Sequence, residues 1–550
     1  MSGNGSNGKV SFHTTELQFG EVREVDGTAV TLRAEHLSRK IDKVEYAVEL
    51  GAFVLIAANS SDLIASVSSI HLVEGQDKDM NPVERRVVTC TLVGFLREGH
   101  IFERGIERYP TVGALAYLLT EAALTEMFST ATDGVVIGER CQRGGGNEHV
   151  RVDRMFGRHT AILGTSGSGK SWTVASLIQS AMEELPHTRM VFLDLHDEYR
   201  AAFPEDFERL ERKVHHISMD NFSIPHWALN VEELEALFMS QEHSAGNQSA
   251  LVREIIRELK AKNAKDLDPH KVSVNTPIPY SFSKLVELLK ERNTEMVPGA
   301  RTEKAGPFNG KLSNLILRLE ARRNDPRFAF LFQEQGEQAT GLKDLLDELF
   351  GVTANSQLAV LDLSGLSSDV LSTVVGVITR LCFEYKYWDD DPNTLPLTLV
   401  LEEAHNYLPR GDSARHRICL DRVEQVAKEG RKYGVGLLVI SQRPSELSET
   451  VLSQCANFVV LRLTNPNDQL YVRKLLPDFL SVAVDMLPYL RTGESVISGE
   501  AVEMPTRVRI KQPVPAPKSE DINYLSGWRD GLPDGYSIDS VVERWRKRER

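Results

Sequence analysis

The glycine-rich segment 164–171 is the part of the sequence that points most clearly to a chemical function. It reads GTSGSGKS, fits the pattern G-x-x-x-x-G-K-S/T, follows the apolar run TAIL and precedes a run of helical composition. In this pattern, backbone N–H groups surround phosphates at a helix N-terminus, the lysine neutralises the terminal phosphates and the hydroxyl binds Mg²⁺. An ordinary glycine-rich turn is the alternative. We predict that the nucleotide, ATP, contacts Gly164, Thr165, Ser166, Gly167, Ser168, Gly169, Lys170, Ser171 and Trp172.

A second candidate feature is an apolar run, 397–401, that ends in Glu402 and Glu403. In P-loop ATPases the first acid at such a strand end contacts the magnesium shell, and the next polarises the attacking water. We therefore assign Glu402 to Mg²⁺, together with Ser171, and Glu403 to catalysis. Glu402 stands where an aspartate is more usual, so the rate of hydrolysis is less predictable than binding. The alternative is a solvated strand end, because paired acids are common on surfaces.

Three further residues are candidates for the same site. Asp194 ends an apolar run and either approaches the nucleotide from a neighbouring strand or caps the following turn. Gln442 follows the run 436–440 and is either a sensor of the γ-phosphate or an ordinary strand-end glutamine. Arg431 either reaches across a subunit boundary to stabilise transition-state charge or is a helix-terminal cation favoured by the dipole.

The pattern of apolar residues predicts the elements that position these side chains. Period-two runs before residue 110 predict a small antiparallel barrel or sandwich, and 114–128 has helical composition. After residue 150, short apolar runs alternate with helical segments, which predicts a mostly parallel sheet covered on both faces. The predicted strands are 160–163, 190–193, 358–361, 397–401, 436–440 and 458–461, and the predicted helices of an insertion include 250–264, 281–292 and 311–323.

The fold class expected from this organisation is α/β, with a P-loop ATPase core, an N-terminal β-barrel and an inserted helical subdomain. The core resumes after the insertion, and the chain finishes in a proline-rich, then basic, extended arm. The predicted parts are a disordered N-terminus (1–18), the barrel (19–112), a connector (113–149), the core (150–231 and 350–510), the helical insertion (232–349) and the C-terminal arm (511–550).

Composition excludes several classes of protein. The 550 residues, 41% hydrophobic and 26% charged, indicate a multidomain globular chain rather than a collagen-like or wholly disordered one. No run approaches the roughly 18 apolar residues of a membrane span, so we expect a cytoplasmic protein without a membrane partner. Five scattered cysteines indicate reduced thiols. The net charge of −14 argues against a broadly basic coat but allows a local positive channel inside an assembly.

Taken together, these motifs resemble the HerA family of hexameric ATPases, within the HerA and FtsK group of P-loop motors, and in particular its bacterial members. The resemblance is strong over about 150–510. The β-rich start is similar to the family's N-terminal barrel in its pattern of short strands, more than in any motif. The matching segments are RHTAILGTSGSGKS (158–171), LDLHDEY (193–199), LDLSGL (361–366), LVLEEAHNYLP (399–409), EGRKYG (429–434), SQRPSEL (441–447) and NPNDQLY (465–471).

The resemblance implies a RecA-like core in a homo-hexamer, with ATP between subunits and double-stranded DNA in the central pore. It implies that Lys170 and Ser171 bind phosphate and magnesium and that Glu403 is the catalytic residue. It also implies that Gln442 senses the γ-phosphate and that Arg431 is an arginine finger, which reaches into the ATP site of the neighbouring subunit. It also implies that Arg158 contacts nucleotide and that Arg410 lines the pore. We expect phosphate contacts from the loop that holds Arg410, Arg415 and Arg417, although a solvated basic loop is nearly as plausible.

The expected function is an ATP-driven DNA translocase or helicase that works with a separate effector. Similar proteins are paired with NurA-type nucleases in end processing, or with other nucleases or sirtuin-type NADases in phage defence. A nucleotide-regulated scaffold with slow turnover is the alternative, and a conjugation motor like VirB4 or the coupling proteins is a third. The sequence leaves open the effector, the direction of movement, the stability of the oligomer without nucleotide, and the roles of the insertion and arm.

Overall fold

The computed structural model describes most of the chain, and its described residues form two compact units. The first unit comprises residues 1–186, 403–405 and 436–514, and the second comprises 187–402, 406–435 and 515–550. The described residues are 15–41, 44–58, 61–76, 82–97, 101–128, 134–141, 146–205, 214–218, 223–238, 245–298, 302–332, 341–411, 415–476, 484–518, 522–533 and 535–547. Most of the predicted disordered N-terminus therefore lies outside the described residues, and Thr15–Leu17 form a short 3-10 helix with Leu17 buried.

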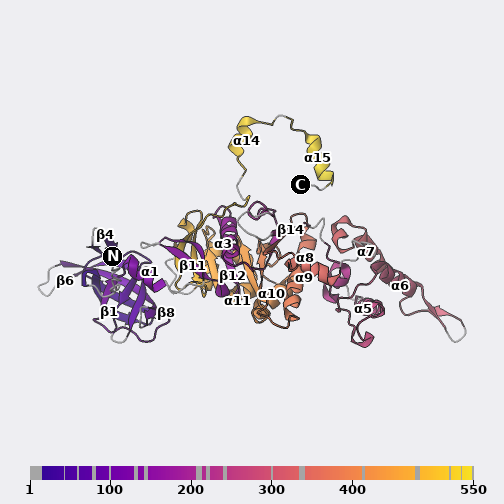
Figure 1. The fold of residues 1–550 in the computed structure, drawn as a ribbon, viewed down its shortest axis with the longest axis horizontal. Coiled ribbons are helices and arrows are strands. Elements are labelled where there is room, and N and C mark those ends of the chain that lie inside the picture. The colour runs from indigo at the N-terminus through magenta and orange to yellow at the C-terminus, as the bar shows by residue number, and fades with distance from the viewer. Residues whose placement is uncertain are drawn as a thin grey trace, which may run out of the picture. The chain divides into compact units, whose positions relative to one another are not determined.

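The N-terminal part of the first unit is a closed antiparallel barrel (Figure 1). Its strands follow the order β2-β1-β9-β5-β6-β7-β8, and β2 also pairs with β7, so the sheet closes on itself. Burial alternates along β2, where Val30 and Leu32 are fully buried, as the period-two pattern predicts. The strands are β1 (Gln18–Asp26), β2 (Ala29–Ala34), β5 (Phe53–Ile56), β6 (Asp62–Gln76), β7 (Pro82–Leu96), β8 (Phe102–Arg104) and β9 (Leu115–Leu118), with a separate hairpin of β3 (Ser38–Ile41) and β4 (Val44–Ala47).

The helical composition predicted for 114–128 is wrong for its first part. Leu115–Leu118 form strand β9, which pairs with β1 and β5, and helix α1 begins only at Glu121 and ends at Phe128. The physical reason is tertiary. Ala116 and Leu118 fill the barrel core, and the hydrogen bonds of β9 join two strands that would otherwise have open edges.

The rest of the first unit holds the P-loop. Strand β12 (Thr160–Leu163) pairs in parallel with β19 (Val435–Ser441) and β20 (Asn457–Val460), and α3 (Lys170–Glu184) packs against β10 and β12. The strand order is β11-β10-β22-β21-β20-β12-β19. The remaining elements are β10 (Gly134–Arg140), β11 (Asn147–Arg151), α2 (Val152–Met155), η7 (Pro444–Glu446), α11 (Glu449–Gln454), α12 (Pro466–Leu475), η9 (Leu487–Tyr489), β21 (Glu494–Gly499) and β22 (Thr506–Ile510).

The connection after β21 contacts the barrel. Arg104, at the end of β8, donates hydrogen bonds to the carbonyl oxygens of Val502 and Glu503 at 2.9 and 2.8 Å. A guanidinium that binds two consecutive carbonyls fixes the turn between β21 and β22 against the barrel strand.

The second unit contains a parallel sheet in the order β18-β13-β17-β14. Strand β13 is buried along its whole length, as expected for a strand covered on both faces. Helices α9 and α10 pack on each other in this unit. The elements are β13 (Met190–Asp194), β14 (Val214–Ser218), β17 (Leu358–Asp362), α9 (Ser368–Tyr387), β18 (Leu397–Leu401), α10 (Arg417–Glu429) and η6 (Gly430–Tyr433). The short helix η5 (Ala404–Asn406) belongs to the first unit up to His405.

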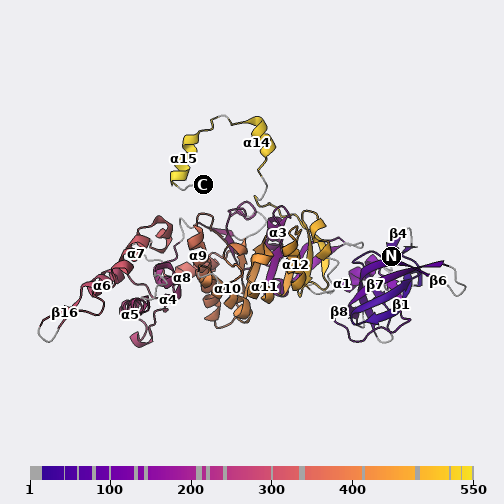
Figure 2. The ribbon, with the colours of Figure 1, turned by 180° about the vertical axis from the view of Figure 1, so that it is seen from behind.

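Within its described residues, the segment predicted as a helical insertion consists of helices joined by loops and one short hairpin. Helix α6 packs against α5 and α7, and a two-residue hairpin of β15 (Met296–Val297) and β16 (Lys304–Ala305) interrupts a stretch that we expected to be free of strands. Figure 2 shows these helices from behind. They are η2 (His226–Ala228), α4 (Val231–Phe238), α5 (Ala245–Asn263), η3 (Pro269–Lys271), α6 (Phe282–Thr294), α7 (Ser313–Arg323), η4 (Pro326–Leu331) and α8 (Leu342–Phe350).

The C-terminal arm, which we expected to be extended, contains two short helices, α14 (Tyr524–Asp530) and α15 (Ile538–Lys547). Neither helix has a buried residue. Among the described helices, none combines the length and the apolar character that a membrane span requires.

A buried ion pair joins α4 to α9. The guanidinium of Arg380 contacts both carboxylate oxygens of Glu233, at 2.6 and 2.9 Å, and also binds the carbonyl of Ala228 and the carboxylate of Glu384. The side chains of Arg380 and Glu233 are 7% and 0% exposed. Removing one partner would leave a buried charge uncompensated.

We therefore expect Arg380→Ala to lower the free energy of unfolding by about 3–5 kcal/mol, measured by urea denaturation. The matched control is Arg422→Ala, which breaks a pair with Glu232 whose carboxylate is 67% exposed, and should cost less than about 1 kcal/mol. Replacing both partners, with Glu233→Leu and Arg380→Met, should recover most of the loss. Equal effects of the two arginine substitutions would contradict this account.

Candidate functional site

The loop between β12 and α3 has a backbone that only small residues fit. Gly169, the N-cap of α3, has φ +93°, a left-handed conformation that glycine adopts without strain. A Cβ atom there would lie 2.8 Å from the backbone nitrogen of Gly493, and one on Gly164 would lie 2.7 Å from the Ser168 hydroxyl oxygen. The loop backbone is therefore packed closely against neighbouring residues such as Gly493, which leaves no room for side chains at these two glycines.

Two residues far away in the sequence hold this loop in place. Thr165 donates from its backbone nitrogen and its hydroxyl to the carbonyl of Arg462, at 3.0 and 2.9 Å. Arg462 and Thr492 in turn donate to the carbonyl of Gly167, at 2.9 and 3.2 Å, and Gly493 donates to Ser168. Protein donors thus hold the carbonyl groups of the loop. Sequence reasoning missed Arg462 and Thr492 because no motif marks them.

The structure brings three predicted residues into direct contact. The Lys170 ammonium lies 2.6 Å from Oε1 of Glu403, and the Gln442 amide donates to that same oxygen at 2.6 Å. The side chains of Lys170 and Glu403 are only 5% and 3% exposed. Glu403 has φ +45°, which is uncommon for a residue with a side chain and costs of order 1–3 kcal/mol. The local backbone is thus strained where it presents this carboxylate.

Electrostatics keep Glu403 ionised. Burial alone would raise the pKa of its carboxyl group, but the charge and hydrogen bond of Lys170, with help from Gln442, lower this pKa below its ordinary value. A buried carboxylate that is ionised and held by two donors on one oxygen can accept a proton or orient water through its other oxygen.

That other oxygen faces His405, a residue to which the sequence analysis gave no role. Nδ1 of His405 lies 3.3 Å from Oε2 of Glu403 and 3.3 Å from the hydroxyl oxygen of Ser441 at the end of β19. Burial lowers the pKa of His405, and the charge of Glu403 only partly opposes this. The ring is therefore neutral at pH 7. The available signal was its position two residues after Glu403.

In the second unit, Glu402 and Asp194 bind backbone groups. Glu402 is 1% exposed, and its Oε2 accepts a hydrogen bond from the Leu195 nitrogen at 3.3 Å. The carboxylate of Asp194 accepts from the backbone nitrogens of His196 and Tyr199, at 3.1 and 3.0 Å, and burial raises its pKa to about 6. These contacts match the alternative interpretation of Asp194, a carboxylate that caps the turn. Its approach to nucleotide stays a prediction.

The remaining nucleotide candidates lie at different places. Ser171 and Trp172 are half-buried in the first turn of α3. Arg158 forms an ion pair with Glu500 at 3.1 Å. Arg431 is exposed in η6, and within the described part of the chain its side chain has no hydrogen bond or ion pair.

The three arginines predicted to contact DNA flank residues 412–414, which lie outside the described part of the chain. Arg410 is exposed. Arg415 donates to the Ser368 hydroxyl at 2.6 Å, and Arg417 is 71% exposed, with Asp421 3.9 Å away. Arg415 is thus engaged within the chain, whereas the head of Arg417 is largely in solvent.

The loop fits a bound phosphate and its magnesium ion. The Ser168 hydroxyl is buried, and no hydrogen-bond partner is found for it among the described residues. The described residues include no cluster of three or more His, Cys, Asp or Glu side chains that could hold a metal alone. Mg²⁺ usually takes one or two protein ligands and completes its shell with phosphates and water. A single hydroxyl such as that of Ser171, in the first turn of α3, suits that chemistry.

A P-loop between a parallel strand and a helix, with a buried carboxylate at the lysine, defines a RecA-like P-loop ATPase. Comparison with known families agrees. The family model "Helicase HerA, central domain" matches residues 135–382, and "Helicase HerA-like C-terminal" matches 372–523. The chain belongs to the HerA family, which confirms the resemblance, the predicted fold class and the predicted ATPase activity.

Individual relatives match over most of the chain. The DNA double-strand break repair helicase HerA of Sulfolobus acidocaldarius is 27% identical over 445 residues, covering 79% of this chain and 80% of its own. The protein of the same name from Sulfurisphaera tokodaii is 26% identical over 537 residues, covering 92% and 96%. Among solved structures, VirB4 of Thermoanaerobacter pseudethanolicus is 18% identical, covers 70% of this chain and 97% of its own, and has a TM-score of 0.46.

The geometry predicts that His405 positions Glu403. In His405→Ala we expect kcat for ATP to fall about tenfold, equivalent to about 1.4 kcal/mol, with KM unchanged. His405→Asn keeps a donor and should recover most of the loss, whereas Asn406→Ala, at the exposed neighbour, should behave like the wild type. Because burial lowers the pKa of His405, wild-type kcat should stay level as the pH falls from 8 to the ordinary histidine value of 6.5. A change in KM alone would contradict the positioning role.

Proposed function

We propose that this protein is the subunit of a homo-hexameric ring that hydrolyses ATP and moves double-stranded DNA through its central pore. The observation that carries the proposal is the buried contact of Lys170, Glu403 and Gln442. It supports a site that couples phosphate binding to the release of a catalytic base.

The coupling follows from competition for one ammonium group. A γ-phosphate that enters the loop competes with Glu403 for Lys170, because both are anions and Lys170 is a single buried cation. Glu403 then gains freedom to accept the proton of an attacking water, and Gln442, which donates to the same carboxylate, would sense the phosphate. Mg²⁺, bound by Ser171 and Glu402 in this proposal, would neutralise charge on the phosphates.

Completion of the site by a neighbouring subunit is supported by Arg431. Its guanidinium is exposed and has no partner within the described part of its own chain, which suits a group that acts on a second copy. Closed cyclic symmetry then gives every subunit one site and one finger. The number six comes from the family resemblance.

The DNA substrate is supported by the names of the relatives, which are DNA double-strand break repair helicases. We propose that Arg410, Arg415 and Arg417 contact the phosphate backbone in the pore, so that binding has little sequence preference. We further propose a separate effector, either a nuclease of the NurA or another type in end processing, or a sirtuin-type NADase in phage defence. The family resemblance motivates this partnership.

A nucleotide-regulated scaffold with slow turnover is the second candidate function. It is favoured by Glu402, which replaces the more usual aspartate and is 1% exposed with Oε2 bonded to the Leu195 backbone. A carboxylate engaged in this way is slower to reorganise around a metal.

The rate of ATP hydrolysis with and without linear duplex DNA separates the two functions. We expect DNA to stimulate turnover, the stimulation to weaken steeply with added salt, and Glu403→Gln to abolish turnover. The control Glu446→Gln, at an exposed carboxylate paired with Arg443, should retain it. Turnover that is insensitive to both DNA and salt would favour the scaffold.

The subunit boundary is tested with Arg431→Ala. We expect folded oligomers that bind nucleotide without hydrolysing it, whereas Lys432→Ala, at the exposed neighbour, should stay active. Mixing inactive Arg431→Ala subunits with inactive Glu403→Gln subunits should restore turnover, because some sites then combine an intact Glu403 with an intact Arg431. If the mixture stays inactive although mixed oligomers form, Arg431 does not act across the boundary.

A further inference from the structure

Helix α15 presents an amphipathic surface, and in the described part of the chain none of its residues is buried. Ile538, Val541, Val542 and Trp545 recur at positions i, i+3, i+4 and i+7, so they share one face of the helix. Ile538 is 70% exposed and Trp545 is 80% exposed. A helix with such a face normally buries it against a partner.

The same helix carries positive charge around Trp545. Arg544 and Arg546 flank the indole, both are exposed, and Lys547 follows in the last turn. The chain as a whole has a net charge of −14. The basic end of α15 is therefore suited to an acidic surface with an apolar centre.

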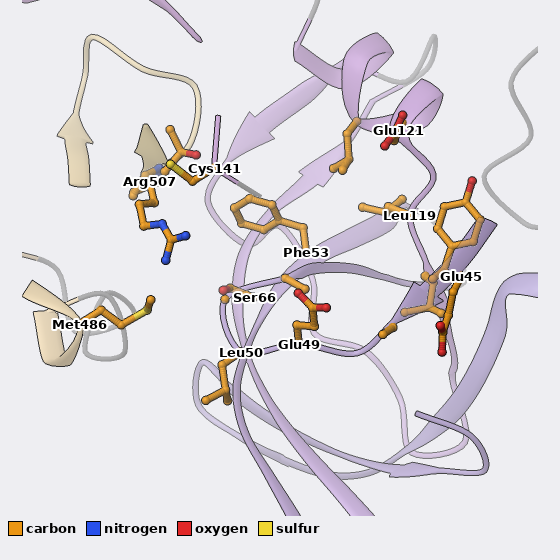
Figure 3. A pocket seen from close by; sticks show the side chains of 18 of the residues that line it. Glu45, Glu49, Leu50, Phe53, Ser66, Leu119, Glu121, Cys141, Met486 and Arg507 are labelled. Atoms are coloured by element: carbon orange, nitrogen blue, oxygen red, sulfur yellow. The ribbon is translucent and has the colours of Figure 1, made fainter. Parts of the chain in front are cut away.

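The first unit contains a cavity with these properties. It has a volume of about 390 Å³ and lies between the barrel and strands β21 and β22. In Figure 3, Phe53 lies between Leu119 on one side and Cys141 with Arg507 on the other. Further apolar lining comes from Leu118, Leu124, Met486 and Val496.

The rim of this cavity is acidic. Glu45, Glu49 and Glu121 line it, and all three are exposed. Among the described residues of the lining, Arg507 is the one guanidinium, so their charged groups sum to a negative value. An apolar floor with carboxylates at the edge complements a tryptophan flanked by arginines.

We propose that helix α15 of one subunit docks into the cavity between the barrel and β21–β22 of a second copy, with Trp545 as its anchor. One arm and one cavity per chain give a head-to-tail contact that a closed ring satisfies completely. The proposal concerns assembly. It rests on the proposed function only in that it requires subunits of this protein to associate.

The arm is long enough to reach a neighbour. Its start is tied down by the hydrogen bond from the Lys518 nitrogen to the carbonyl of Glu198. From there to Ile538 the chain spans about 50 Å when extended, with α14 included at helical rise, which exceeds the roughly 30 Å diameter of a small domain.

Cross-linking in the full-length protein tests the proposal. Cys141 lines the cavity and is half-buried, whereas the other four cysteines are buried. Val541→Cys places a thiol on the docking face and keeps Trp545. A short bis-maleimide should then join it to Cys141, giving a ladder of products on a denaturing gel that starts at twice the chain mass. Because burial raises the pKa of Cys141, the reaction is best run at mildly alkaline pH.

Two matched controls define the result. Leu525→Cys puts an exposed thiol in α14 of the same arm, and Cys141→Ser removes the target, so both should lose the product at least tenfold. Glu49→Arg with Glu121→Arg should weaken the cross-link by a similar factor, and adding Arg544→Glu with Arg546→Glu should restore it.

Three outcomes overturn the proposal: a link only within one chain, equal yield with Leu525→Cys, or no link together with loss of DNA binding when 522–550 are deleted. The last outcome would assign α15 to DNA. The reaction needs neither ATP nor DNA, so its failure leaves the ATPase proposal standing, and loss of ATPase activity leaves the docking result readable.

Discussion

The buried ion pair between Lys170 and Glu403 is the contact on which the rest of the site depends. Both groups are almost fully withdrawn from water, and a lone charge at that depth would be costly. The free-energy cost of burying each charge is offset because the two groups neutralise each other. Gln442 also donates to Oε1 of the carboxylate, and Nδ1 of His405 lies 3.3 Å from Oε2. A phosphate that takes over Lys170 changes the balance of charge for all four groups at once.

The sequence predicted the P-loop strand and helix well because their signal is local. The run TAIL is strand β12 and Lys170 begins α3. Lys170 was named from the glycine-rich pattern, and Glu403 and Gln442 were named from strand ends, since the carboxyl ends of parallel strands meet at one edge of a sheet. The sequence did not predict that Lys170 and Gln442 both bind the same oxygen of Glu403. The oxygen of Glu403 that Lys170 shares with Gln442 brings together residues that are 233 positions apart in the sequence.

The errors and omissions have tertiary causes. Leu115–Leu118 has helical composition but forms β9, because the barrel supplies hydrogen-bond partners on both sides of it. Arg462 and Thr492 hold the P-loop by side-chain bonds to a carbonyl, a contact that leaves no pattern in the sequence. His405 is only two residues from Glu403 in the sequence, but its role is indicated only by the 3.3 Å distance from its Nδ1 to Oε2 of Glu403.

Strand β21 connects two of the features described above. Just before its first residue, Gly493 donates to Ser168 and leaves no room for a side chain on Gly169. Three and four residues after its end, the carbonyl groups of Val502 and Glu503 accept hydrogen bonds from Arg104 of the barrel. Six residues of strand measure about 20 Å and stretch little. The phosphate loop and the barrel are therefore tied to opposite ends of one short strand, which fixes the distance between these two contacts.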